Sequence, residues 1–450
     1  MKLTHLAVAC AALSVSATHA ANYVLSAPNW GASQTAAVAA AGGSVQYSHA
    51  SSGVAIVTSD NAGFLARVLK GGAVASGAED RVVSWQPPVA ADETMFIDAA
   101  VNPANDTLYG LQWAPKAISA PGAWALGFTG AGVRVAVIDG GIYAAHLDLA
   151  TNIDVAASRS FVAPNPLASA AVNACRTAFN CDTGTFWHGT HVSGIIAAVD
   201  NTRGVIGIAP GATIVGVKAL HNGSGSFGAI IQALLYASTD GRADVINMSL
   251  GAEFNRNEQG AAELISSLNK AVNFAARNGS LVVVAAGNSG LDLDAEKNLI
   301  VTPAESGNAI AISATAPLAW AYGATNYSRF SSYSNFGNAL VTVAAPGGDF
   351  AYPGNENCTV LVTRPCWVFD MILSTVRGSS AAGAYGWAAG TSMAAPAAAA
   401  VAALIKQRFP AANPAQLKTK LAQSADDAGK VGQNALYGRG FVNALRAVTE

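Results

Sequence analysis

The chain has 450 residues, of which 51% are hydrophobic and 12% are charged, so it can bury a large core and is too long for one average domain. Its formal net charge is -2, and it has no long run of basic residues. This balance argues against nucleic acid as the main partner. We expect one large and one small folded unit.

The first 20 residues have the pattern of a secretory signal peptide. Lys2 precedes an apolar run over residues 6–15, and small residues continue to Ala20 and Ala21. The charged start, short apolar centre and small cleavage residues distinguish this segment from a membrane span. We therefore expect cleavage after Ala20 or Ala21, a secreted or periplasmic protein, and no stable membrane insertion.

Residues 21–85 predict a small α+β unit. Alternating apolar residues and turn signals give the order strand, helix, strand, strand, helix, strand, which is typical of a split βαβ, ferredoxin-like fold. The predicted strands are 23–27, 44–48, 54–58 and 81–85, and the predicted helices are 33–41 and 61–69. The stretch from Pro87 to Thr94 then predicts an extended, breakable linker.

The remainder predicts an α/β domain with one parallel sheet. Runs rich in Val, Ile and Ala alternate with helical segments, as in sheets that are covered by helices on both faces. These runs are residues 133–138, 213–218, 245–248, 281–285, 309–313 and 340–344. Ligands of such sheets bind beyond the carboxyl ends of the strands.

Four cysteines follow the signal peptide, and an even number in an exported chain favours disulfides. Of the three possible connectivities, we expect Cys175–Cys181 and Cys358–Cys366, because each pair closes a short loop at little entropic cost. Free buried thiols are the alternative.

Three distant motifs supply an acid, a base and a nucleophile. Asp139 ends the apolar run Val-Ala-Val-Ile-Asp, and His188 begins His-Gly-Thr-His-Val-Ser-Gly. Ser392 lies in Gly-Thr-Ser-Met-Ala-Ala-Pro at the start of an apolar helix, whose positive end polarises the site. A serine hydroxyl is a weak nucleophile, so it needs both the base and the orienting carboxylate.

These motifs, in the order Asp, His, Ser, resemble the subtilisin-like serine protease family over residues 109–442. The resemblance implies peptide-bond hydrolysis through an acyl-enzyme, with Ser392 as nucleophile, His188 as base and acid, and Asp139 as the orienting residue. Gly140 departs from the family's Ser or Thr, and we expect a looser hydrogen-bond environment around Asp139 and a lower rate.

The resemblance also implies the domain organisation. Residues 21–105 correspond to a propeptide and its linker, which act as intramolecular chaperone and inhibitor until autocatalytic removal between Ala91 and Asp106. Residues 106–450 correspond to the peptidase domain. A permanently retained accessory domain is the alternative for the small unit.

Further site residues follow from the same resemblance. Asn288, with the Ser392 backbone N–H, corresponds to the oxyanion hole; a purely structural asparagine in a loop turn is the alternative. Extended substrates are expected to pair with two flanking strands and to insert one side chain into a primary pocket. Val301 is expected to fill part of the pocket floor and to favour small or medium side chains. The strand and pocket residues are Gly223, Ser224, Gly225, Ser249, Leu250, Gly251, Ala285, Ala286 and Gly287; a Gly/Ser turn and a strand end are the alternative for the strands.

Calcium is the usual stabiliser in this family, and Asp148 and Asn201 lie in segments that resemble its strong site. No organic cofactor is expected. Zinc on His188 and His191 is disfavoured because no Glu follows His188 as in HExxH.

The expected partners are protein or peptide substrates and the chain's own propeptide, and the expected state is a monomer. A non-catalytic binding or scaffold protein with the same fold is the main rival. An α/β-hydrolase esterase is a second rival, but the chain lacks a Gly-x-Ser-x-Gly elbow and has the wrong order of triad residues.

Overall fold

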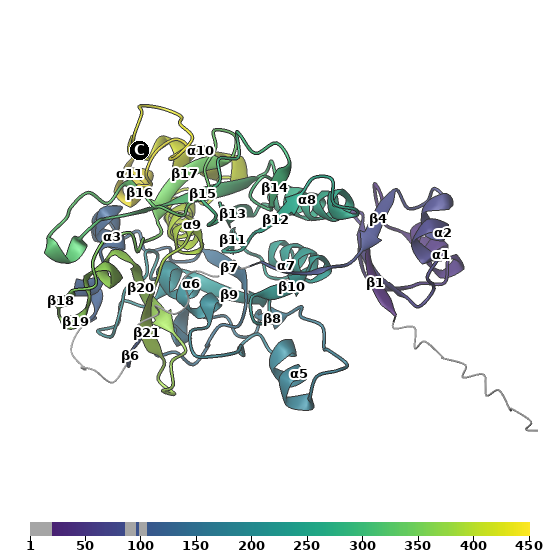
Figure 1. The fold of residues 1–450 in the computed structure, drawn as a ribbon, viewed down its shortest axis with the longest axis horizontal. Coiled ribbons are helices and arrows are strands. Elements are labelled where there is room, and N and C mark those ends of the chain that lie inside the picture. The colour runs from purple at the N-terminus through teal and green to yellow at the C-terminus, as the bar shows by residue number, and fades with distance from the viewer. Residues whose placement is uncertain (1–19, 86–95, 99–105) are drawn as a thin grey trace, which may run out of the picture.

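A computed structural model describes residues 20–85, 96–98 and 106–450 (Figure 1). Residues 1–19 of the predicted signal peptide and the whole predicted linker, residues 87–94, lie outside the described residues. Figure 1 shows a small N-terminal unit, in purple, that packs against one side of a larger α/β body.

The small unit is an antiparallel sheet with two helices on one face. Its strands are β1 (Ala21–Ser26), β2 (Ser44–His49), β3 (Val54–Ser59) and β4 (Ser76–Glu79), in the order β2-β3-β1-β4. The helices are α1 (Ala32–Ala40) and α2 (Phe64–Lys70). Leu25 and Val57 pack beneath the helices, whereas Val24 and Ile56, one residue away on each strand, join the core of the large body. Both faces of this small sheet are therefore covered.

The prediction for residues 81–85 was wrong in one respect. β4 closes the small sheet, and the next strand, β5 (Val82–Ser84), instead pairs antiparallel with β10 (Ser224–Ser226) of the large body. Val82 is 72% exposed, whereas Val83 and Trp85 pack in the core cluster of the large body, so the apolar face of this segment is used there. Its backbone groups are satisfied by an edge that the sequence does not reveal.

The large body confirms the predicted parallel sheet. Its strand order is β16-β15-β13-β11-β7-β9-β8, and β17 pairs with β15. All of these pairings are parallel except the short one between β15 and β16. The strands are β7 (Arg134–Asp139), β8 (Arg159–Ser160), β9 (Thr213–Lys218), β11 (Val245–Met248), β13 (Leu281–Ala285), β15 (Ala309–Ala316), β16 (Arg329–Phe330) and β17 (Val341–Pro346).

Helices cover both faces of this sheet, and β7 shows why. Val135 and Val137 pack in one core cluster with α6 (His188–Ala197) and α9 (Thr391–Arg408). Ala136 and Ile138 pack in the other with α7 (Phe227–Ser238) and α8 (Ala261–Arg277). Successive side chains of a strand point to opposite faces, so an entirely apolar strand requires two helical layers.

The remaining elements surround this core. The helices are α3 (Ala114–Ala117), α4 (Ala120–Ala125), α5 (Ala170–Thr177), α10 (Pro414–Gln423) and α11 (Ala444–Thr449). The strands are β6 (Phe96–Asp98), β12 (Ala252–Asn255), β14 (Leu299–Thr302), β18 (Asn357–Val360), β19 (Val362–Pro365), β20 (Ile372–Val376) and β21 (Ala384–Ala388).

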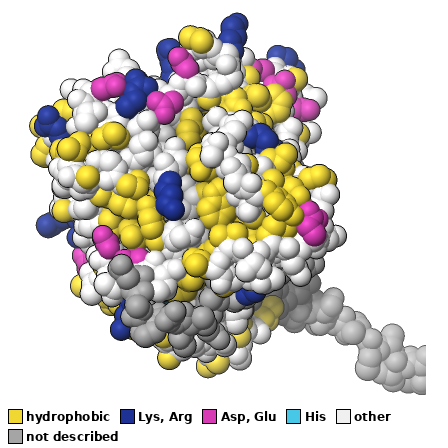
Figure 2. Space-filling model, turned by 90° about the vertical axis from the view of Figure 1, so that its left-hand side faces the viewer, with side chains coloured by type: hydrophobic (Ala, Val, Ile, Leu, Met, Phe, Trp, Pro, Cys, Tyr) yellow, Lys and Arg dark blue, Asp and Glu magenta, His cyan; other side chains and the backbone are white. Residues whose placement is uncertain are grey.

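Both predicted disulfides are present. Cys175–Cys181 joins α5 to the segment that precedes α6, and Cys358–Cys366 closes the β18–β19 hairpin. This hairpin lies on the side of the body away from the small unit (Figure 1). Figure 2 shows that side, where hydrophobic side chains gather in patches with few charges between them. Among the helices of the described residues, none combines the length and apolarity needed to cross a bilayer.

Candidate active site

Asp139 and His188 meet at the carboxyl end of the parallel sheet. Asp139 is the last residue of β7, and His188 is the first residue of α6. His188 Nδ1 lies 3.0 Å from Asp139 Oδ1 and 2.9 Å from Oδ2. A carboxylate only accepts hydrogen bonds, so Nδ1 carries the proton and Nε2 is left as the basic nitrogen. The buried Asp139 also accepts from Gly140 N at 2.6 Å.

Ser392 lies in the first turn of α9, which packs against α6. Pro396 has no N–H for the Ser392 carbonyl four residues earlier. The Ser249 hydroxyl replaces it, donating to Ser392 O at 2.7 Å while Asn247 Nδ2 donates to the same hydroxyl at 3.0 Å. These bonds tie the start of α9 to the end of β11.

The Ser392 hydroxyl donates to Ser249 O at 3.3 Å in this conformation. Its proton is therefore directed at a carbonyl, and the side chain must turn before it can donate to an imidazole. The structure thus brings Asp139 and His188 into direct contact and places Ser392 on the adjoining helix in a resting orientation.

Asn288 is oriented by the residue before the nucleophile. Its Oδ1 accepts from both Thr391 N and Thr391 Oγ1, each at 2.8 Å. A backbone N–H can only donate, so the atom that faces it must be the amide oxygen. The Asn288 Nδ2 group therefore points away from Thr391, as an oxyanion donor requires.

A cavity of about 290 Å³ joins these residues to the predicted pocket. It contains Ser392 and Asn288, and Val301 lines it as predicted. Ala286 does not, because it is fully buried behind the wall. The lining residues are Ser84, Leu250, Gly251, Ala252, Glu253, Ala285, Gly287, Asn288, Ser289, Val301, Thr391 and Ser392.

The two predicted substrate strands already hold a segment of the same chain. Trp85 N donates to Gly223 O at 3.0 Å, and Gly251 N donates to Trp85 O at 2.8 Å. The indole Nε1 donates to Gly225 O at 2.9 Å, and its ring packs edge-on against Phe227 with centroids 4.9 Å apart. Trp85 is completely buried. The sequence did not indicate that the segment ending at Trp85 pairs with these two predicted strands.

Two other histidines are excluded as catalytic bases by their surroundings. His191 Nε2 lies 3.1 Å and 3.0 Å from the carbonyls of Ile372 and Gly386, and burial lowers the pKa of His191 to about 3. Burial likewise lowers the pKa of His146 to about 4. Carbonyls only accept, so His191 donates from Nε2 and remains neutral.

The predicted calcium residues lie apart from the cavity. Asp148 is fully buried; its Oδ2 accepts from Val205 N at 3.0 Å, and its Oδ1 has no hydrogen bond from the described residues. Burial raises the pKa of Asp148 to about 7. Asn201 Oδ1 accepts from Arg203 N at 3.0 Å. Within the described residues, no group of three or more His, Cys, Asp or Glu is arranged to hold a metal.

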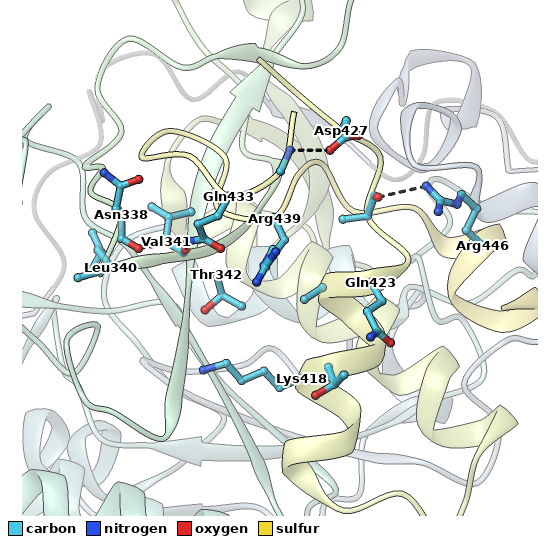
Figure 3. Close-up of a pocket in the computed structure, with 15 residues that line it drawn as sticks. Asn338, Leu340, Val341, Thr342, Lys418, Gln423, Asp427, Gln433, Arg439 and Arg446 are labelled. Atoms are coloured by element: carbon cyan, nitrogen blue, oxygen red, sulfur yellow. Dashed lines mark hydrogen bonds between the residues drawn. The ribbon is translucent and has the colours of Figure 1, made fainter. Parts of the chain in front are cut away.

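A second cavity, of about 690 Å³, lies between β17 and α10 and is lined by Lys418 and Arg439 among others (Figure 3). None of the candidate catalytic or substrate residues lines it. This cavity therefore provides a place for control substitutions.

An α/β fold with an Asp–His pair, a helix-borne serine and an oriented amide at one sheet edge defines a serine peptidase. The subtilase family model matches residues 130–440. Subtilisin DY of Bacillus licheniformis is 33% identical over 331 residues, which is 73% of this chain and 96% of that protein. Subtilisin Savinase of Lederbergia lenta is 35% identical over 336 residues, covering 74% and 97%.

A solved structure extends the similarity of fold to the small unit. The epidermin leader peptide processing serine protease of Staphylococcus aureus is 23% identical, with a TM-score of 0.74 over 95% of this chain and 98% of that one. The chain belongs to the subtilase family. It is a serine-type endopeptidase, and the rival of a non-catalytic scaffold is not supported.

Proposed function

We propose that Ser392, His188 and Asp139 form the catalytic triad of an exported endopeptidase that matures by cleaving its own precursor. The hydroxyl of Ser392 turns from Ser249 O to His188 Nε2 and attacks the scissile carbonyl carbon. His188 takes the hydroxyl proton and then returns it to the leaving amine, while Asp139 holds the tautomer and stabilises the imidazolium. Water hydrolyses the resulting acyl-enzyme through the same base.

Asn288 and the Ser392 backbone N–H stabilise the tetrahedral intermediate in this proposal. The two bonds from Thr391 to Asn288 Oδ1 support the assignment, because they fix the direction of the amide before the substrate arrives. Donors held in advance need no reorganisation when negative charge develops on the substrate oxygen.

Substrates bind as an additional strand between β10 and the Ser249–Gly251 segment. The support is the segment around Trp85, which already uses Gly223 O and Gly251 N as its partners. Main-chain pairing gives affinity without sequence preference, so side-chain preference falls to the pockets. Because Val301 lines the primary pocket beside Ala285, we propose a preference for small or medium side chains.

The small unit, residues 21–105 with its linker, acts as an inhibitory propeptide. In addition to the Trp85 contacts, two residues hold this unit to the large body. Asp80 accepts from Gly228 N at 3.1 Å, and Arg81 forms an ion pair with Glu258. Lys270 Nζ also donates to Ala27 O at 3.1 Å. A substrate cannot pair with β10 while β5 does, so activity requires release of this unit.

The observation that carries the proposed mechanism is the contact of His188 Nδ1 with both oxygens of Asp139 beside the helix that bears Ser392. The test compares purified wild-type precursor with Ser392→Ala. The wild type should shed the small unit and hydrolyse casein, whereas the variant should remain full length. An Arg439→Ala variant in the remote cavity should behave like the wild type. Equal processing by Ser392→Ala would contradict the assignment.

We further propose a structural calcium ion at Asp148 and Asn201. The unpartnered, buried Asp148 Oδ1 supports the proposal, since hard oxygen donors suit calcium and a buried carboxylate benefits from a cation. Calcium should then raise the melting temperature of wild type but not of Asp148→Asn. We propose that the mature enzyme is a monomer outside the cytoplasm, acting on protein or peptide substrates.

A further inference from the structure

Gly140 and Gly141 follow the catalytic aspartate, and a carboxylate from another loop fills the space beside them. Asp182 Oδ2 accepts from Gly141 N at 2.9 Å. A Cβ built on Gly140 would overlap this same oxygen and lie 3.4 Å from Asp182 Cγ. No other heavy atom of the described chain beyond the neighbouring residues comes within 4 Å of that position. A side chain at residue 140 and the carboxylate of Asp182 would therefore compete for the same space.

The other oxygen of Asp182 reaches the substrate side of the site. Asp182 Oδ1 accepts from Asn222 N at 3.2 Å and from Thr183 N at 2.9 Å. Asn222 has a positive φ of 52° and immediately precedes Gly223, whose carbonyl pairs with the bound strand. One side chain thus connects the turn after Asp139 to the start of the substrate strand.

Three neighbouring contacts hold Asp182 in place. Its neighbour Cys181 is bonded to Cys175, which fixes the local backbone. The buried Lys218 donates from Nζ to Cys181 O, and Lys218 lies opposite Asp139 in the register of β7 and β9. His221 Nδ1 lies 3.9 Å from Asp182 Oδ1, and the Lys218 ammonium at the Cys181 carbonyl also interacts electrostatically with this carboxylate.

We propose that Asp182 is a positioning residue for proteolysis. Its carboxylate holds the backbone that follows Asp139 and the backbone at the start of β10, and it thereby substitutes for the side chain that residue 140 lacks. The proposal rests on the proposed catalytic role of Asp139. It also revises the expectation that Gly140 leaves the turn loose, because the lost hydroxyl is replaced by a carboxylate from the disulfide-closed loop.

The test is an exchange experiment in the full-length precursor, using Gly140→Ser, Asp182→Ala and the double variant. Each single change should lower kcat of the released enzyme about 10- to 100-fold, because small displacements of catalytic groups have such effects. Gly140→Ser forces the serine against Asp182, and Asp182→Ala removes the brace. In the double variant the serine gains room, and kcat should recover to above that of both single variants.

KM and folding separate positioning from a general structural role. Asp182→Asn keeps the shape and one acceptor oxygen, so it should fold like the wild type with an intermediate kcat and a nearly unchanged KM. Asp154→Ala is the matched control: Asp154 accepts from Ala157 N at 3.0 Å and pairs with Arg134 at the opposite end of β7. Its removal should leave kcat within about twofold of the wild type.

Two results would overturn the inference. One is a kcat within twofold of the wild type for both Asp182→Ala and Asp182→Asn. The other is a double variant whose loss equals the product of the two single losses. Labelling of the wild type by a serine-directed phosphonate separates this failure from failure of the triad, because Ser392 must be labelled if the triad is correct.

Discussion

Replacing Trp85 with Ala tests whether the small unit inhibits by mimicking a substrate. The indole is fully buried, packs against Phe227 and donates to Gly225 O. Removing a buried Trp costs about 3–5 kcal/mol, and about 1.4 kcal/mol corresponds to a tenfold change in affinity. Residues 21–105 added to the mature enzyme should therefore inhibit about 10²- to 10³-fold more weakly when they carry Trp85→Ala.

The assay measures the inhibition constant against a fluorogenic peptide, with circular dichroism to verify that the added unit is folded. Val82→Ala is the matched control, because Val82 lies three residues before Trp85, in β5, and is 72% exposed. That control should change the inhibition constant about twofold at most. If a folded Trp85→Ala unit inhibits as strongly as the wild type, the β5 segment is not what blocks the enzyme.

Three further predictions follow from the site and its core. Asn288→Ala should lower kcat about 10²- to 10³-fold with little change in KM in peptide kinetics, a magnitude taken from the corresponding change in subtilisin. A loss below about threefold would contradict the assignment of Asn288 to the oxyanion hole. Val301→Gly should raise kcat/KM for an aromatic over an alanine residue before the scissile bond by about tenfold or more, and an unchanged ratio would show that Val301 does not limit the pocket. His191 protonates below about pH 6.5 in the unfolded chain but stays neutral down to about pH 3 in the folded chain. The free energy of unfolding should therefore fall by up to about 5 kcal/mol as the pH decreases from about 6.5 to about 3, and this residue should cause no change above about pH 6.5. A His191→Gln variant should show a shallower slope in urea melts across that range, and an equal slope would contradict a buried neutral imidazole.

The sequence predicted the elements whose signal is local. The strands at 245–248 (Val-Ile-Asn-Met) and 281–285 (Leu-Val-Val-Val-Ala) match the structure residue for residue, because short, mainly apolar runs specify strands that are buried on both faces. The Asp139–His188 contact was predictable for a related reason. Both residues stand at element ends that a parallel sheet brings to the same edge.

The features that were missed depend on contacts between distant segments. Nothing near Trp85 indicates that the preceding strand, β5, pairs with β10 rather than with the small sheet, since a three-residue strand has too little pattern to select an edge. Gly140 likewise suggested a looser hydrogen-bond environment around Asp139, and only the folded chain brings Asp182 against it. A sequence pattern indicates which residues of an element are buried, but it does not indicate which distant segment packs against them.

The most direct test of the central claim is covalent labelling of the mature enzyme with a serine-directed phosphonate, followed by peptide mass spectrometry. We expect one adduct on Ser392 in the wild type, and strongly reduced labelling in His188→Ala and in Asp139→Asn. Labelling of a different serine in active enzyme, or labelling of Ser392 that is unaffected by loss of His188, would contradict the catalytic arrangement.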